Sequence, residues 1–134
     1  MIQELYQLYK QHPSIQTDTR KLKTGDCYFA LKGPNFDGNV FAQQAIEAGA
    51  AFAVIDDQKF EIREKTFLVP NVLTALQQLA LHHRKQFTIP FLDITGSNGK
   101  TTTKELIHAV LSSTMKTYTT YGNLNNHIGV PLTI

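Results

Sequence analysis

The stretch TGSNGKTTT, residues 95–103, is the part of the sequence that most constrains the fold. An apolar segment, Phe91 to Thr95, precedes it and predicts a strand, whereas Lys100 to Met115 has the apolar spacing of an amphipathic helix. Glycines at such a strand-to-helix turn let backbone N–H groups converge on phosphate oxygens, and the positive end of the helix faces the same anion. The sequence therefore predicts a nucleotide-binding phosphate loop in an α/β fold.

Each part of this loop has a predicted role. Lys100 brings a positive charge to the β- and γ-phosphates and is the predicted catalytic residue. The hydroxyl of Thr101 is the predicted Mg²⁺ ligand. Two residues, rather than the usual four, separate Gly96 from the Gly99–Lys100 pair, so the loop is shorter than the common form. The residues predicted to bind the nucleotide are Gly96, Ser97, Asn98, Gly99, Lys100, Thr101 and Thr102.

Upstream of the loop, helices and strands alternate. The continuous apolar runs predict strands buried on both faces of a parallel sheet. The Ile89-Pro90 break predicts a domain boundary between residues 1–88 and 89–134. The predicted helices are Met1 to Gln11, Val40 to Ala48 with a left-handed cap at Gly49, and Val72 to Ala80 with Asn71 as its N-cap; the predicted strands are Cys27 to Leu31, Ala51 to Ile55, Phe67 to Val69 and, after the long helix, Lys116 to Thr120.

Composition and charge exclude several classes of protein. The chain has 134 residues, 42% hydrophobic and 18% charged, so it can bury a core and is not disordered. Thirteen basic and eleven acidic residues give a net charge of +2 without a basic block, which disfavours nucleic-acid binding. No apolar run approaches the roughly 18 residues of a membrane span. The single cysteine, Cys27, is predicted to lie in the core and is typical of a cytoplasmic protein.

The loop at residues 95–102 resembles the shortened phosphate loop of the Mur ligases, ATP-dependent amide-forming enzymes of peptidoglycan synthesis. About ninety residues precede it, which matches a Mur ligase with its own N-terminal domain for a UDP-linked substrate. The glycine fingerprint of the ligases that add the first and second residues is absent near residue 10. The resemblance implies a small α/β UDP-substrate-binding domain at residues 1–88, followed by the start of a phosphate-loop parallel-sheet ATPase domain at residues 89–134.

Two further stretches resemble the elements that hold the uridine and pyrophosphate of the substrate in this family. Residues 18–20, DTR, resemble an Asp-Ser-Arg element and keep its hydroxyl. Residues 30–41, ALKGPNFDGNVF, resemble an Ala-Leu-x-Gly stretch followed by Asp-Gly-His-x-Phe, with an asparagine where histidine is usual. The resemblance implies substrate contacts from Thr19, Arg20, Asp37, Gly38 and Asn39.

Residues 122–131, GNLNNHIGVP, resemble the asparagine-rich element of the family members that add the terminal dipeptide. This resemblance implies substrate contacts from Asn123, Asn125, Asn126 and His127. Their own chemistry agrees, because amides and an imidazole after a strand at the carboxyl edge of a parallel sheet lie where such sheets bind ligands. A polar loop in which asparagine tolerates left-handed backbone remains an alternative.

The resemblance implies that D-alanyl-D-alanine is joined to a UDP-MurNAc-tripeptide through an acyl phosphate, with ATP as cosubstrate and Mg²⁺ as the metal. These small molecules are the expected partners, with no nucleic acid and no membrane insertion. The alternatives are a ligase that adds the third residue, a non-catalytic UDP-sugar-binding module and an unrelated phosphate-loop hydrolase. The chain ends on the apolar stretch VPLTI, residues 130–134, so we expect a fragment that has no ligase activity in isolation.

Overall fold

The computed structural model of the protein describes residues 1–122 and 124–134. Within these ranges, four parallel strands form the main sheet in the spatial order β1-β2-β5-β6. The central strand β2 pairs at Cys27 with Ile15 on one side and with Phe52 on the other. The parallel sheet predicted from the apolar runs is therefore confirmed. Its strands are β1 (Ile15–Gln16), β2 (Cys27–Phe29), β5 (Phe52–Ile55) and β6 (Thr66–Leu68).

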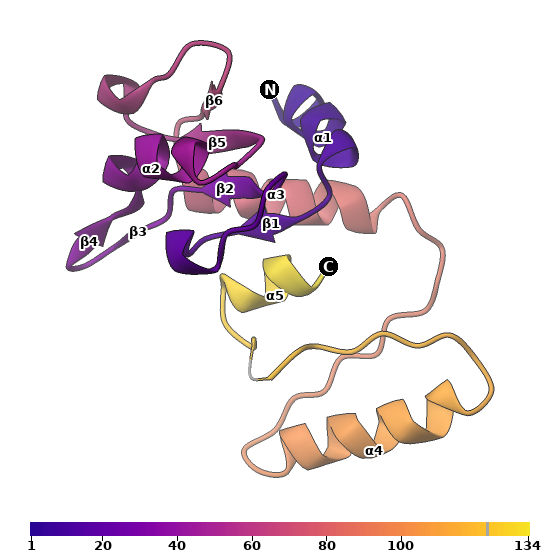
Figure 1. Ribbon diagram of the computed structural model, residues 1–134. Helices are drawn as coiled ribbons and strands as arrows, with labels where there is room; N and C mark the ends of the chain where they lie inside the picture. Colours follow the sequence, from indigo (N-terminus) through magenta and orange to yellow (C-terminus); the bar gives the residue numbers. More distant parts are fainter. Residues whose placement is uncertain (123) are drawn as a thin grey trace.

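Helices cover both faces of this sheet (Figure 1). The helices α1 (Ile2–Gln11) and α3 (Val72–Arg84) pack on one face, and α2 (Ala42–Glu47) packs on the other. Successive side chains of a strand point to opposite faces. Accordingly Cys27 and Phe29 lie in the core beneath α1 and α3, whereas Tyr28 lies in the core beneath α2. The result is a three-layer α/β/α unit whose strands are buried on both sides.

Local sequence signals explain the helix boundaries. The Asn71 side chain accepts a hydrogen bond from the backbone N–H of Thr74 at 2.8 Å and caps α3, as predicted. Gly49 follows α2 with a φ of 103°, so the predicted left-handed cap is also present. The helix predicted from Val40 is divided in the structure, because a 3-10 helix, η2 (Gly38–Phe41), precedes α2.

Three short 3-10 helices in the described chain begin in the same way, each with an aspartate as N-cap. Asp18 opens η1 (Thr19–Lys21), Asp37 opens η2, and Asp57 opens η3 (Gln58–Phe60). Each carboxylate accepts the backbone N–H two residues ahead, at 2.9–3.0 Å. A small antiparallel hairpin, β3 (Lys32–Gly33) with β4 (Phe36–Asp37), leads into η2. The 3-10 helices and the paired strands β3 and β4 were not predicted, because each is too short to produce a periodic pattern.

The remainder of the chain contains α4 (Lys100–Ser112) and α5 (Gly129–Thr133). α4 starts where predicted, and Figure 1 shows it standing apart from the three-layer unit. The strands predicted at 91–95 and 116–120 are wrong for the described residues, where neither segment pairs with another strand. A strand needs a hydrogen-bonded neighbour and buried apolar side chains, yet Leu92 is 66% exposed and Tyr118 is 79% exposed. The first segment is apolar and the second is β-branched and aromatic, but neither has a sheet beside it.

Candidate functional site at the carboxyl edge of the sheet

The side chains predicted to contact the UDP-linked substrate follow the carboxyl ends of neighbouring parallel strands. Residues 18–20 come directly after β1, and residues 32–39 come after β2. Asp56 comes directly after β5, the next strand in the sheet. Open α/β sheets bind ligands at this edge, because the loops after all parallel strands meet there. The fold therefore brings Thr19, Arg20, Asp37, Gly38 and Asn39 to one edge of the sheet.

At the end of β1, Asp18 and Arg20 form a two-pronged ion pair. Arg20 donates from Nε to Asp18 Oδ1 at 2.9 Å and from Nη2 to Oδ2 at 2.8 Å. These side-chain hydrogen bonds, together with the backbone N–H of Arg20, lower the pKa of Asp18 to about 2. The guanidinium itself remains largely exposed. Arg20 is thus held in a fixed orientation by Asp18 while its remaining donors face solvent.

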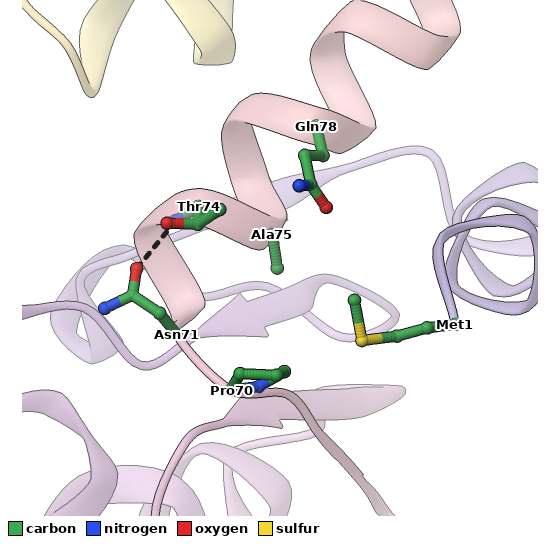
Figure 2. A pocket seen from close by; sticks show the side chains of 6 residues that line it. All are labelled: Met1, Pro70, Asn71, Thr74, Ala75 and Gln78. Carbon is green, nitrogen blue, oxygen red and sulfur yellow. Dashed lines mark hydrogen bonds between the residues drawn. The ribbon is translucent and has the colours of Figure 1, made fainter.

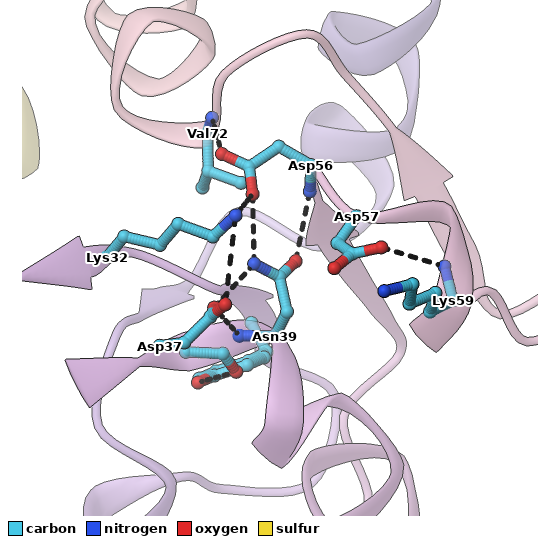
Figure 3. Close-up of polar contacts among 9 residues, drawn as sticks. Lys32, Asp37, Asn39, Asp56, Asp57, Lys59 and Val72 are labelled. Atoms are coloured by element: carbon cyan, nitrogen blue, oxygen red, sulfur yellow. Dashed lines mark hydrogen bonds and ion pairs between the residues drawn. The ribbon is translucent and has the colours of Figure 1, made fainter.

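Asn39 is fully buried rather than facing solvent (Figure 3). Its Nδ2 donates to Asp37 Oδ1 at 2.7 Å and to Asp56 Oδ1 at 2.9 Å. Its Oδ1 accepts the backbone N–H of Asp56 at 3.0 Å. The side chain that stands where histidine was expected is therefore engaged on both its donor and its acceptor atoms within the protein. Direct contact of Asn39 with a substrate stays a prediction, and its geometry favours a role in holding the loop.

Tyr28 of β2 contacts the loop that follows its own strand. Its hydroxyl donates to the carbonyl oxygen of Gly38 at 3.0 Å. Burial of the ring, followed by the nearby negative charges of Asp18 and Asp37, raises the pKa of Tyr28 to about 12. At neutral pH this hydroxyl is protonated and remains a donor.

Two residues at this edge, Lys32 and Asp56, were not among the predicted site residues. Lys32 Nζ lies 2.9 Å from Asp56 Oδ1 and 3.7 Å from Asp37 Oδ2. The Asp56 side chain is only 7% exposed. The sequence signal that could have identified Asp56 is its place immediately after a fully buried strand, where polar residues of a parallel sheet gather.

The phosphate loop has the backbone that its glycines predicted. Gly99 is the N-cap of α4 and has a left-handed conformation with φ 74° and ψ 6°, and Gly96 has φ 150°. Glycine adopts these conformations without the steric cost that a side chain would add. The Lys100 ammonium folds back and donates to the carbonyl oxygen of Gly96. The loop from Gly96 to Thr102 is exposed apart from Lys100, so a phosphate has access to it.

A second lysine of α4 links this helix to the asparagine-rich element. Lys104 Nζ donates to the carbonyl oxygens of Thr120 at 2.8 Å and Gly122 at 3.2 Å. It also lies 3.1 Å from a carboxylate oxygen of Glu105. This lysine was missed because nothing in its local sequence distinguishes it from a solvated helix residue.

The asparagine-rich element leads into α5, and the structure uses part of it as a cap. Asn123 lies outside the described residues. Asn126 Oδ1 accepts the backbone N–H groups of Ile128 at 3.1 Å and Gly129 at 2.7 Å. Asn125 and His127 are exposed. The substrate roles of these side chains stay predictions, and they lie in a different part of the chain from the edge that holds Arg20 and Asp37.

A hollow of about 240 Å³ lies elsewhere, at the N-terminal ends of α1 and α3 (Figure 2). The Met1 ammonium there pairs with Glu4 at 2.7 Å. The lining residues offer no other charged group, so the hollow lacks the cations that a diphosphate needs. Its lining is Met1, Pro70, Asn71, Thr74, Ala75 and Gln78, which includes none of the predicted site residues.

Two family models match the chain on either side of the predicted boundary. The model described as Mur ligase family, catalytic domain, matches residues 13–84, which is more than half of the chain. The chain belongs to the Mur ligase family. The model described as Mur ligase middle domain matches residues 94–134. The resemblance stated from the phosphate loop and the fold class are both confirmed.

Individual Mur ligases show how much of such a protein the chain represents. It is 50% identical over 124 residues to the UDP-N-acetylmuramoyl-tripeptide–D-alanyl-D-alanine ligase of Synechocystis sp., covering 90% of this chain and 27% of that relative. A crystal structure of MurF from Acinetobacter baumannii superposes with a TM-score of 0.83 at 33% identity, covering 99% of this chain and 32% of that one. A MurF ligase from Thermotoga maritima in complex with ADP gives a TM-score of 0.77 at 31% identity, covering 89% of this chain and 28% of that one. The chain thus spans about a quarter to a third of the length of these relatives.

Two further observations concern the metal and the membrane. In the described part of the chain, no three His, Cys, Asp or Glu side chains gather where they could hold a metal ion. Mg²⁺ at a phosphate loop is held mainly by phosphates and water, with one protein hydroxyl, and Thr101 in the exposed first turn of α4 fits that single role. Across residues 1–122 and 124–134, no helix combines the length and apolar character that a membrane crossing requires.

Proposed function

We propose that the polypeptide carrying this chain joins D-alanyl-D-alanine to a UDP-MurNAc-tripeptide at the expense of ATP. The observation that carries this proposal is the phosphate loop, in which the left-handed Gly99 opens α4 and Lys100 follows it. It stands in a family of ligases, and these enzymes form amide bonds. The choice of dipeptide and tripeptide is supported by the Synechocystis relative, whose name states both substrates. The similar Thermotoga maritima MurF ligase in complex with ADP supports ATP as the cosubstrate.

The phosphate loop has the parts that phosphoryl transfer to a carboxylate requires. The positive N-terminal end of α4, opened by the left-handed Gly99, attracts the anionic phosphates. Lys100 moves from the Gly96 carbonyl onto the β- and γ-phosphates, where negative charge shifts as the carboxylate of the tripeptide attacks. Thr101 would hold Mg²⁺ through its hydroxyl, and the ion would neutralise phosphate charge. The amine of the dipeptide then displaces phosphate from the acyl phosphate and forms the amide.

Residues 1–88 form the substrate-binding domain in this proposal, and residues 89–134 begin the ATPase domain. Arg20, fixed by Asp18 and with donors facing solvent, supplies a cation for the substrate pyrophosphate. Thr19, Asp37 and Gly38 follow β1 and β2 at the same edge of the sheet and contribute further contacts to the substrate. Asn123, Asn125, Asn126 and His127 are the substrate-binding residues that residues 89–134 contribute in this proposal. We place the protein in the cytoplasm, where ATP and nucleotide-linked precursors are available.

The test uses the full polypeptide that carries this sequence. Phosphate release is measured with ATP, Mg²⁺ and UDP-MurNAc-tripeptide, with and without D-alanyl-D-alanine, and the amide product is identified by mass spectrometry. We expect turnover only when all are present, and loss of turnover in Lys100→Met. Turnover with a diamino acid and UDP-MurNAc-dipeptide instead would identify the third-residue ligase. ATP hydrolysis indifferent to UDP-sugars would identify an unrelated hydrolase.

A further inference from the structure

Asp56 connects the loop after β2 to two other elements (Figure 3). Its Oδ1 accepts hydrogen bonds from Lys32 Nζ and from Asn39 Nδ2, both at 2.9 Å. Its Oδ2 accepts the backbone N–H of Val72, the first residue of α3, at 3.1 Å. Its own backbone N–H donates to Asn39 Oδ1 at 3.0 Å. One carboxylate at the end of β5 thus holds β3, η2 and the start of α3 together.

The charges of this cluster favour a role in holding the loop over direct contact with a phosphate. Asp56 and Asp37 supply two carboxylates against the single ammonium of Lys32, so an anion entering here meets net negative charge. Burial raises the pKa of Asp56, but the hydrogen bonds from Lys32, Asn39 and the backbone of Val72 outweigh burial and lower it. The pKa of Lys32 is raised mainly by its hydrogen bond to Asp56. Both groups are therefore charged at neutral pH and hold each other.

Close backbone packing and the contacts of Asp56 together restrict the conformation of residues 32–39. Gly38 packs so closely that a Cβ atom on it would lie 2.5 Å from the carbonyl oxygen of Leu31. The amide of Asn39, next along the chain, is engaged by Asp37 and Asp56. The far end of the loop is held at Lys32 by the same Asp56. Residues 32–39, here called the substrate loop, are thus anchored at both ends by one side chain.

We propose that Asp56 is a positioning residue for the substrate loop: through Lys32 and Asn39 it fixes the loop in the orientation that the UDP-linked substrate requires. This inference rests on the proposed function. Asp56 itself does not touch the substrate and acts only through the loop. Its loss therefore weakens recognition of the UDP-linked substrate and leaves the ATP site, which belongs to a different part of the chain, unchanged.

The experiment compares Asp56→Asn with its neighbour Asp57→Asn in the full polypeptide that carries this chain. Asp57 is the matched control, because it caps η3 through the backbone of Lys59 at 3.0 Å and, among the described residues, forms no hydrogen bond or ion pair with the substrate loop. Steady-state kinetics give KM for the UDP-linked substrate, KM for ATP and kcat. We expect Asp56→Asn to raise KM for the UDP-linked substrate about tenfold, as the loss of one charge-assisted hydrogen bond implies. In Asp56→Asn, KM for ATP and kcat should stay within about twofold of the wild-type values. In Asp57→Asn, all three constants should match those of the wild type.

A double-mutant cycle with Lys32→Gln separates positioning from a general loss of stability. Lys32 is 44% exposed, so its replacement leaves the core intact. If Lys32 acts through Asp56, the double variant is no worse than Asp56→Asn alone.

Equal KM values for Asp56→Asn and wild type would overturn the inference while leaving the proposed function standing, and so would additive effects of the two substitutions on KM. A wild type that does not bind the UDP-linked substrate would overturn the proposed function and this inference with it. If Asp56→Asn does not fold, Lys32→Gln decides: an unchanged KM overturns the inference and a raised one supports it.

Discussion

Gln77 of α3 donates a hydrogen bond from its side-chain Nε2 to the backbone oxygen of His127, at 3.1 Å. This contact joins the two segments that match Mur ligase family models, residues 13–84 and 94–134, across 50 positions of sequence. Beside it, Ile128 and Leu132 pack against the core that α1 and α3 share with the sheet. The asparagine-rich element is therefore attached to the three-layer unit, although the phosphate loop that precedes it stands apart.

The first prediction concerns this docking of α5. Replacing Ile128 with alanine removes a partly buried side chain from the contact, so the free energy of unfolding should fall by about 1–2 kcal/mol. Hydrogen exchange of the α5 amides should accelerate more than that of α3, because α5 loses its anchor first. Urea denaturation and exchange mass spectrometry measure the two effects. Val130→Ala is the control, since Val130 is exposed; an equal effect in both variants would contradict the docking role of Ile128.

The second prediction concerns the charge of Asp18. The hydrogen bonds from Arg20 lower its pKa to about 2, so its carboxylate should titrate with a midpoint near pH 2 in a carboxyl-carbon NMR titration. Because the folded pKa lies below the unfolded value of about 3.9, any stability from the pair is present above pH 4 and is lost as the pH falls toward 2. Arg20→Gln should return the midpoint toward the unfolded value. Arg63→Gln, at an exposed arginine far along the sequence, should leave it unchanged.

The third prediction concerns the thiol of Cys27. Burial in the sheet, followed by the nearby negative charge of Asp26, raises the pKa of Cys27 to about 12. The thiolate is the reactive form, so the folded protein at pH 8 should resist a thiol reagent that labels the urea-unfolded chain within minutes. Rapid labelling under native conditions would show that β2 opens readily. The prediction of Cys27 as a core residue is confirmed, since it is fully buried.

The fourth prediction concerns the close packing at Gly38. A Cβ atom on Gly38 would lie 2.5 Å from the Leu31 carbonyl oxygen and 2.7 Å from the Ala30 carbonyl carbon, both backbone atoms. Gly38→Ala should therefore destabilise the protein by about 1–3 kcal/mol in urea denaturation. Gly33→Ala is the matched control in the same loop, because its new Cβ would meet only the ring of Phe36, which is exposed and can rotate away. Equal destabilisation by both variants would contradict this account.

The elements that could be predicted from sequence are those with local causes. The apolar spacing of α3 and the cap at Asn71 lie within a single stretch of chain, and both are confirmed. The left-handed backbone at position 99 was also predictable from local sequence, because it favours glycine and Gly99 stands there. The strand β1 has only two residues, too few for a period to be visible.

The parts that could not be predicted depend on contacts between distant residues. Asp56 reaches Asn39 across 17 positions and Val72 across 16, so its partners cannot be predicted from a local pattern, although its place after a buried strand is a local signal. The same limit explains the wrong strands at 91–95 and 116–120. Their composition favours a strand, but strand formation depends on a neighbour that sequence pattern alone does not supply.

The parallel sheet also governs the order in which the chain can fold. Every pairing described for the main sheet is parallel, so each strand reaches its neighbour through a crossover and not through a tight turn. As the chain leaves the ribosome, β2 has to wait for β5, and its face toward α1 and α3 is covered by α1 alone until α3 has been synthesised. Closure of the sheet is therefore the slow step of folding, and a nascent chain that stalls before Val72 exposes its apolar strands to aggregation.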